Sequence, residues 1–188
     1  MLMMVIPGLF RHRQGTSPSC YFCTWALNIF TMEMKQYLLD TFKFNDSANR
    51  KMLEKIKTLP DREHSIKFFS HLINSQKKWL VRILLNEKSP AMSWWEPCYK
   101  LDELEAQWDK SIFEWIKFIE SKTEEQLFEV IHFTGWDGGD WEVQLKDIAL
   151  QLNYHSIHHR AQIQMLIRQQ GIDPDFIDYI GTRYKKVK

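Results

Sequence analysis

The longest uninterrupted helical pattern in the chain lies near its C-terminal end. Residues 141–170 contain neither proline nor glycine. Apolar residues recur there every three or four positions, which is the spacing of a helix that buries one face. They are Leu145, Ile148, Leu152, Ile163 and Leu166. Asp140 can cap the start, and Gly171 with Pro174 beyond it can end the helix. We therefore predict a helix from Trp141 to about Gln170, of roughly 28 residues and about 42 Å.

Three further amphipathic segments precede this helix, at about residues 34–60, 61–86 and 101–122. Asp61 or Ser65 can cap the second segment. The link between the second and third segments contains two prolines and is longer than neighbouring antiparallel helices need, so the chain is expected to cross over there. These patterns predict an all-α protein, a four-helix bundle with a long crossover between its second and third helices.

A short stretch before the last helix favours β structure. Residues 127–134 read LFEVIHFT and are rich in β-formers, and the GWDGGD that follows is a tight-turn signal. We expect one short strand or half of a hairpin there.

Length and charge restrict the class of protein. The 188 residues, 44% of them apolar, suit one folded domain, which we place at residues 32–188. Residues 1–31 show no steady period and are expected to be a poorly ordered N-terminal extension. A net charge of +1 and the lack of any run of ~20 apolar residues argue against nucleic-acid and membrane partners. Three cysteines, an odd and small number, favour a reducing compartment, and hence the cytoplasm.

Three of the seven histidines lie within NYHSIHHRAQ, residues 153–162. His155 and His159 continue the apolar stripe of the last helix, about 40° apart around its axis, so both imidazoles point the same way. His158 is rotated by about 100° from His159 onto a flank. If both imidazoles are buried and neutral, their ring nitrogens need hydrogen-bond or metal partners. If both are protonated, their positive charges repel each other. A divalent cation bound to both rings resolves both problems. Alternatively, one histidine bonds a carboxylate or carbonyl while the other reaches solvent.

A metal site on two histidines is weak, so a third ligand from another helix is required. His71 is the best placed, in the middle of the second helix among apolar residues, while His64 and His132 remain alternatives. A metallopeptidase helix needs glutamate as general base directly after its first histidine, and Ser156 occupies that position here, so the sequence does not match that class of enzyme. Glu129 and His132 form the only Glu-x-x-His pair, outside the predicted helices, which argues against a two-metal bundle. A mononuclear site is the better hypothesis.

HLINSQKKWL around His71, together with NYHSIHHRAQ, resembles the DinB/YfiT-like family. The likeness runs over about residues 34–171 and includes FKFNDSANRKML and LIRQQGIDP. The resemblance implies a four-helix bundle with a long connection between helices two and three. It also implies a divalent metal ion held by His71, His155 and His159. Ser47 and Ala161 depart from the tryptophan and glycine that are usual in the family, and leave this ligand set intact.

The resemblance also implies a range of functions. Homodimers are common in the family, and some relatives are thiol transferases that couple a low-molecular-weight thiol, such as bacillithiol or mycothiol, to an electrophile. Three imidazoles leave coordination positions open, as in catalytic sites. Zinc or nickel is favoured, with iron and manganese also suited to nitrogen ligands. The metal would lower a thiol's pKa below its usual value near 8.5, or activate water for hydrolysis. The alternative is a non-catalytic metal-binding or interaction module.

Three side chains are candidates to orient ligands or substrate. Asn74 lies three residues beyond His71, and Gln162 three residues beyond His159, so each is about one helical turn from a candidate ligand. His158 is the third. Ordinary interhelical hydrogen bonds are an equal explanation for the two amides. Trp94 and Trp95 in the crossover are a candidate pocket wall, whereas Trp79, Trp108 and Trp115 are expected in the core.

Overall fold

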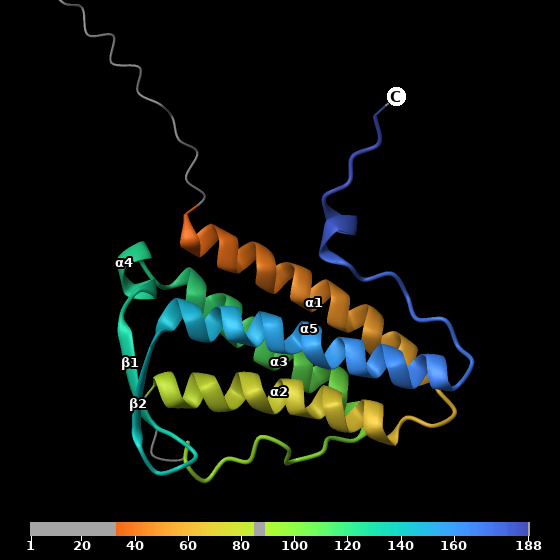
Figure 1. Cartoon of the computed structure of the whole chain (residues 1–188), viewed down its shortest axis with the longest axis horizontal. Helices are drawn as coiled ribbons and strands as arrows, with labels where there is room; N and C mark the ends of the chain where they lie inside the picture. Colours follow the sequence, from red (N-terminus) through yellow and green to blue (C-terminus); the bar gives the residue numbers. More distant parts are fainter. Residues whose placement is uncertain (1–32, 85–88, 188) are drawn as a thin grey trace, which may run out of the picture. The chain divides into compact units, whose positions relative to one another are not determined.

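The structure of the protein is a computed structural model that describes residues 33–84 and 89–187 (Figure 1). Within these residues the chain forms five α-helices, two strands and one 3₁₀ turn. In chain order they are α1 (Met34–Thr58), α2 (Glu63–Ile83), α3 (Leu101–Glu120), α4 (Glu124–Leu127), β1 (Val130–Thr134), β2 (Asp140–Gln144), α5 (Leu145–Gln169) and η1 (Tyr179–Thr182). The predicted all-α fold is confirmed.

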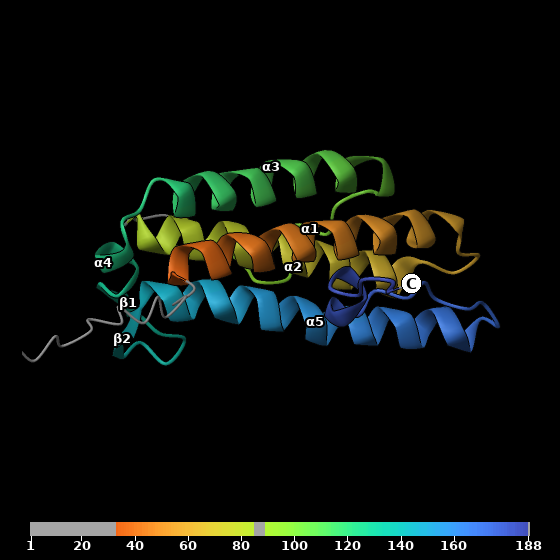
Figure 2. The same ribbon diagram turned by 90° about the horizontal axis from the view of Figure 1, so that it is seen from above.

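The four long helices form the bundle. α1 packs against α3 and α5, and α2 packs against the same two helices, while α1 and α2 make little direct contact. In Figure 2 α3 lies above and α5 below the α1 and α2 pair, and in Figure 1 α5 lies in front of α3, between α1 and α2. Residues 89–100 run back along α2 before α3 begins, which is the predicted crossover (Figure 1). α2 and α5 are thus direct neighbours although they are far apart in the sequence.

The core lies along the common axis of these helices and is rich in aromatic rings. Trp108 and Trp115 on α3 are fully buried, and their rings pack against Phe69 and Phe42 respectively. Both indole N–H groups are satisfied: Trp108 Nε1 donates to Asp46 Oδ1 at 2.8 Å, and Trp115 Nε1 donates to the carbonyl oxygen of Gln76 at 2.9 Å. Buried tryptophans need such partners, so these bonds tie α3 to α1 and α2.

The last helix begins later than the sequence predicted. It starts at Leu145, and Asp140–Gln144 form strand β2, which pairs antiparallel with β1. Asp140 therefore caps no helix, and Trp141 is a strand residue. The hairpin is complete because Gly138 adopts a φ of 77°, a left-handed conformation that glycine tolerates in a tight turn. The predicted start lay one turn earlier because Asp140 is a residue type that commonly caps helices.

The start of α2 also differs in detail from the prediction. The helix begins at Glu63, and neither Asp61 nor Ser65 is the cap residue, although Asp61 Oδ1 accepts a hydrogen bond from the Glu63 N–H at 3.3 Å. The predicted end near Asn86 and the predicted extension at residues 1–31 lie outside the described residues. Within residues 33–84 and 89–187, no helix is long and apolar enough to cross a membrane.

Candidate metal centre

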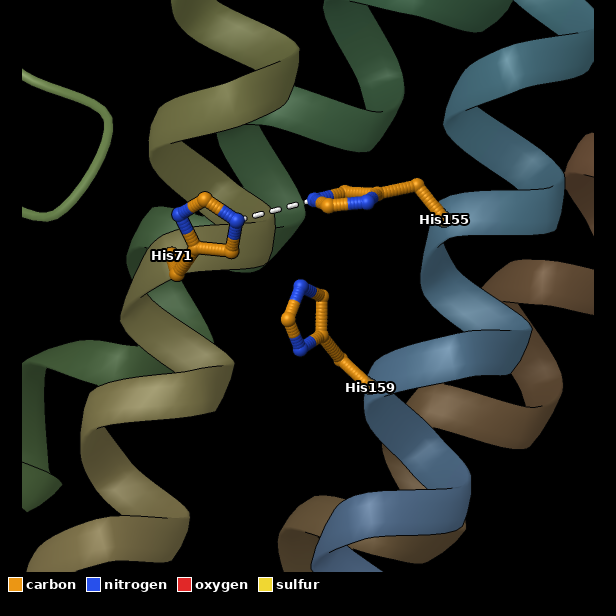
Figure 3. Close-up of side chains that lie close together, drawn as sticks. All are labelled: His71, His155 and His159. Carbon is orange, nitrogen blue, oxygen red and sulfur yellow. Dashed lines mark hydrogen bonds between the residues drawn. The ribbon is translucent and has the colours of Figure 1, made fainter.

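Three histidines meet at the seam between α2 and α5 (Figure 3). His71 comes from α2, and His155 and His159 come from successive turns of α5. One nitrogen from each ring lies within 4.8 Å of the others, and the Nε2 atoms of His71 and His155 are 2.9 Å apart. Since metal–nitrogen bonds are about 2.0–2.1 Å long, this spacing suits one cation.

Hydrogen bonds on the outer side of two rings set which nitrogen is available. His71 Nδ1 is 2.7 Å from the carbonyl oxygen of Trp94, and His159 Nδ1 is 2.6 Å from Gln162 Oε1. Both partners are acceptors, so each Nδ1 carries the proton and each Nε2 keeps its lone pair. Metal-binding histidines usually show this arrangement. The donor set therefore fits a divalent cation.

Burial keeps these imidazoles neutral. Loss of solvent lowers the pKa of His155 to about 4, with further lowering from the neighbouring His159, His71 and His158. Burial likewise lowers the pKa of His159 to about 4, although the hydrogen bond that His159 donates to Gln162 Oε1 acts in the opposite direction, and burial also lowers the pKa of His71. The neutral form predominates at pH 7, and only neutral imidazole binds a metal ion.

A cavity of about 280 Å³ lies beside the histidines. Its lining residues are His71, Ser75, Trp79, Trp94, Trp95, Gln151, Leu152 and His155. The prediction that the crossover tryptophans form a pocket wall is confirmed, and the Trp95 ring stacks on the His71 ring with centroids 3.9 Å apart. Trp79 was expected in the core, but it is only partly buried and lines this cavity instead.

The other residues singled out in the sequence lie in different surroundings. Gln162 contacts His159, as described above. Asn74 is buried and donates to the carbonyl oxygen of Pro97 at 3.0 Å, so it fastens the crossover to α2. His158 is exposed on the flank of α5. His64 is exposed at the start of α2, and His132 is exposed on β1, with its Nδ1 atom 3.8 Å from Glu142 Oε2. Among the candidates for a third ligand, only His71 meets His155 and His159.

Two features of the site were missed by the sequence reasoning. The Ser75 hydroxyl is buried in the cavity wall and has no hydrogen-bond partner among the described residues. Ser75 lies one helical turn after His71, and this spacing could have predicted that its hydroxyl faces the site. Behind the histidines, Asn45, Asn49, Ser156 and Arg160 form a buried polar network between α1 and α5. Their i, i+4 spacing on both helices marks a shared polar layer.

The fold and this cluster define a helical bundle with a candidate mononuclear metal site. The model of the DinB family matches residues 32–186, which is most of the chain. The chain therefore belongs to the DinB family. No curated protein matches it.

Proposed function

We propose that this protein is a metal-dependent enzyme in which His71, His155 and His159 bind one divalent cation, and that its reaction joins a small thiol to an electrophile. The observation that carries the proposal is the convergence of three neutral imidazoles, two of them buried and one partly buried, beside a cavity. A closed structural site would have a fourth protein ligand, whereas no other histidine, cysteine or carboxylate of the described residues belongs to this cluster.

In such a site the metal ion supplies the reactivity, and the protein positions the ligands and the substrate. A divalent cation held by neutral imidazoles lowers the pKa of a thiol or of water that reaches it. The Trp94 carbonyl and Gln162 keep the rings of His71 and His159 in orientation. Trp79, Trp94 and Trp95 line the cavity with apolar surface that can contact the apolar part of a substrate.

The Ser75 hydroxyl can make a hydrogen bond to a substrate, because it has no hydrogen-bond partner among the described residues. It lies in the cavity wall, one turn after His71 on the same face of α2. A buried hydroxyl without a partner costs free energy, so a polar group of the substrate is a suitable partner for it. In this proposal Ser75 positions the substrate relative to the histidines.

Several parts of the proposal follow from the family resemblance and the donor set. Zinc or nickel is the proposed metal, with iron and manganese as the alternatives that nitrogen ligands also suit. A low-molecular-weight thiol and an electrophilic small molecule are the proposed substrates. A homodimer in the cytoplasm is the proposed state of the protein, with residues 1–31 as an extension of the folded domain.

Elemental analysis of the purified protein tests the first half of the proposal. About one divalent ion per chain is expected, lost in His155→Ala and retained in His158→Ala, because His158 is exposed and outside the cluster. Equal metal content in the two variants would refute the site.

The second half is tested with the metal restored. A panel of small thiols is combined with a chromogenic haloaromatic electrophile, and conjugation is measured for the wild type and for His155→Ala. Turnover in the wild type alone supports the enzyme. A bound ion that stabilises the fold, with no turnover of any thiol and no exchangeable water, would favour the non-catalytic module instead.

A further inference from the structure

A buried positive charge lies on the side of α5 that faces α1. Arg160 is 3% exposed. Its Nη1 donates to Ser156 Oγ at 2.9 Å and to Asn45 Oδ1, and the Phe44 ring lies 5.4 Å from its Cζ. All of these partners are neutral. No carboxylate within residues 33–84 and 89–187 makes an ion pair with it.

Such an arrangement is uncommon, since buried charges in proteins are normally paired. Loss of solvent lowers the pKa of Arg160 to about 10, so the guanidinium still carries its charge at neutral pH. Nη1 makes both hydrogen bonds, and Nε and Nη2 have no acceptor among the described residues. These two donors form one edge of the guanidinium, the edge that holds a carboxylate through two parallel bonds.

A cavity of about 350 Å³ lies next to this group. Its walls are largely apolar and include Phe44, Ile157, Ile177 and Tyr179. The last two belong to the segment that follows α5, and the Tyr179 ring packs edge-on against Phe44 with centroids 5.2 Å apart. The cavity shares no lining residue with the cavity at the histidines, so the two are separate sites.

We propose that this cavity binds the carboxylate of a small apolar organic acid, with Arg160 as its anchor. The carboxylate takes the unused guanidinium edge, and the apolar remainder of the acid contacts Phe44, Ile157 and Tyr179. A volume of about 350 Å³ is at the small end of ligand-binding pockets, which suits an acid with one ring or a short chain. The proposal does not depend on a metal at the histidines.

Asp178 is the acidic residue among those that line this cavity. Asp178 is exposed and lies on the segment after α5, and it is not within ion-pair distance of Arg160. Its negative charge beside the cavity opposes an incoming anion. Asp178→Asn is therefore expected to tighten binding of the acid. Weaker binding in this variant would show that the site does not select an anion.

Calorimetric titration of the full chain with benzoate, and with benzamide as its neutral counterpart of similar shape, tests the proposal. Benzoate is expected to bind about tenfold or more tightly than benzamide, since a charge-assisted pair distinguishes them. Sodium chloride at matched ionic strength controls for general screening. Equal affinity for the two compounds, or no binding of either, would overturn the proposal.

Two variants locate the site without removing Arg160 from its network. Ala161→Phe adds a ring at an exposed position that lines the cavity, and is expected to abolish benzoate binding while the protein stays folded. Gln169→Phe, at an exposed position of the same helix outside the cavity, should bind benzoate like the wild type. Unchanged binding in Ala161→Phe would place the acid elsewhere.

The same titration separates this site from the metal centre. His155→Ala is expected to bind benzoate as the wild type does, because His155 does not line this cavity. Loss of benzoate binding in His155→Ala would mean that the acid binds at the histidines, and would contradict a separate site. This result leaves the proposed metal-dependent reaction to its own tests.

Discussion

Among single residues, Gln162 has the most specific role. Its Oε1 accepts the Nδ1 proton of His159 and so directs Nε2 of that ring toward His71 and His155. Gln162→Leu removes this acceptor but leaves all three histidines in place. We expect metal affinity to fall by about 10- to 100-fold, the usual effect of losing such a partner. Competition with a chromogenic chelator measures it, and Gln169→Leu, exposed on the same helix, should match the wild type.

The lowered histidine pKa values predict how stability depends on pH. The pKa of His155 and that of His159 are about 4 in the folded state, against 6.5 when the side chain is free in solution. Between pH 6.5 and 4 the unfolded chain therefore binds more protons than the folded one. The free energy of unfolding of the metal-free protein should fall as pH decreases through this window.

Urea unfolding at a series of pH values measures this effect. His159→Gln should show a shallower fall than the wild type between pH 6.5 and 4, because one of the two groups is gone. Gln169→Leu, a change at an exposed, uncharged position of α5, should keep the wild-type slope. Identical slopes in all three proteins would contradict a neutral, buried cluster.

At the scale of helices, the contact between α1 and α5 depends on a buried polar layer. Asn49 on α1 donates through Nδ2 to Ser156 Oγ on α5 at 2.8 Å and to Asn45 Oδ1 at 3.1 Å. Asn49→Leu leaves those two acceptors without this donor. A loss of about 1–3 kcal/mol in the free energy of unfolding is expected. Lys51→Leu, exposed on the same helix, should change stability far less, and urea denaturation compares the two.

For the whole molecule, the metal site joins two elements that are distant in sequence. A cation bound by α2 and α5 together binds the folded state and not the unfolded chain. Zinc at about 100 times its dissociation constant should then add about 2.7 kcal/mol to the free energy of unfolding. This corresponds to a rise in Tm of roughly 5–10 °C, measurable by differential scanning calorimetry. His155→Ala should show no rise, and an equal rise in this variant would place the zinc elsewhere.

Much of the fold was predictable because amphipathic spacing depends on local sequence. The four helices, the crossover and the approach of His155 to His159 all follow from residues close together in the chain. The start of α5 was predicted wrongly at Trp141. Residues 140–144 pair with β1 across a glycine turn, and such pairing with a strand elsewhere in the chain is not visible in helical spacing.

The surroundings of individual side chains were less predictable. Trp79 is as apolar as Trp108, yet it lines the cavity while Trp108 is fully buried. Arg160 directly follows His159 in the sequence, but it faces α1 and a separate cavity. The position of a residue within the helical repeat shows which face of its own helix it occupies. It does not show which neighbour that face meets.

The sequence alone determined the helical architecture and the pairing of His155 with His159, because a helix fixes the direction of side chains four residues apart. Only the tertiary structure decided that His71, and neither His64 nor His132, meets them. It likewise decided that Trp94 and Gln162 orient two of the rings, and that Arg160 is buried without a carboxylate partner among the described residues. These contacts join residues far apart in the chain or side chains whose direction depends on packing, and packing is a property of the assembled bundle.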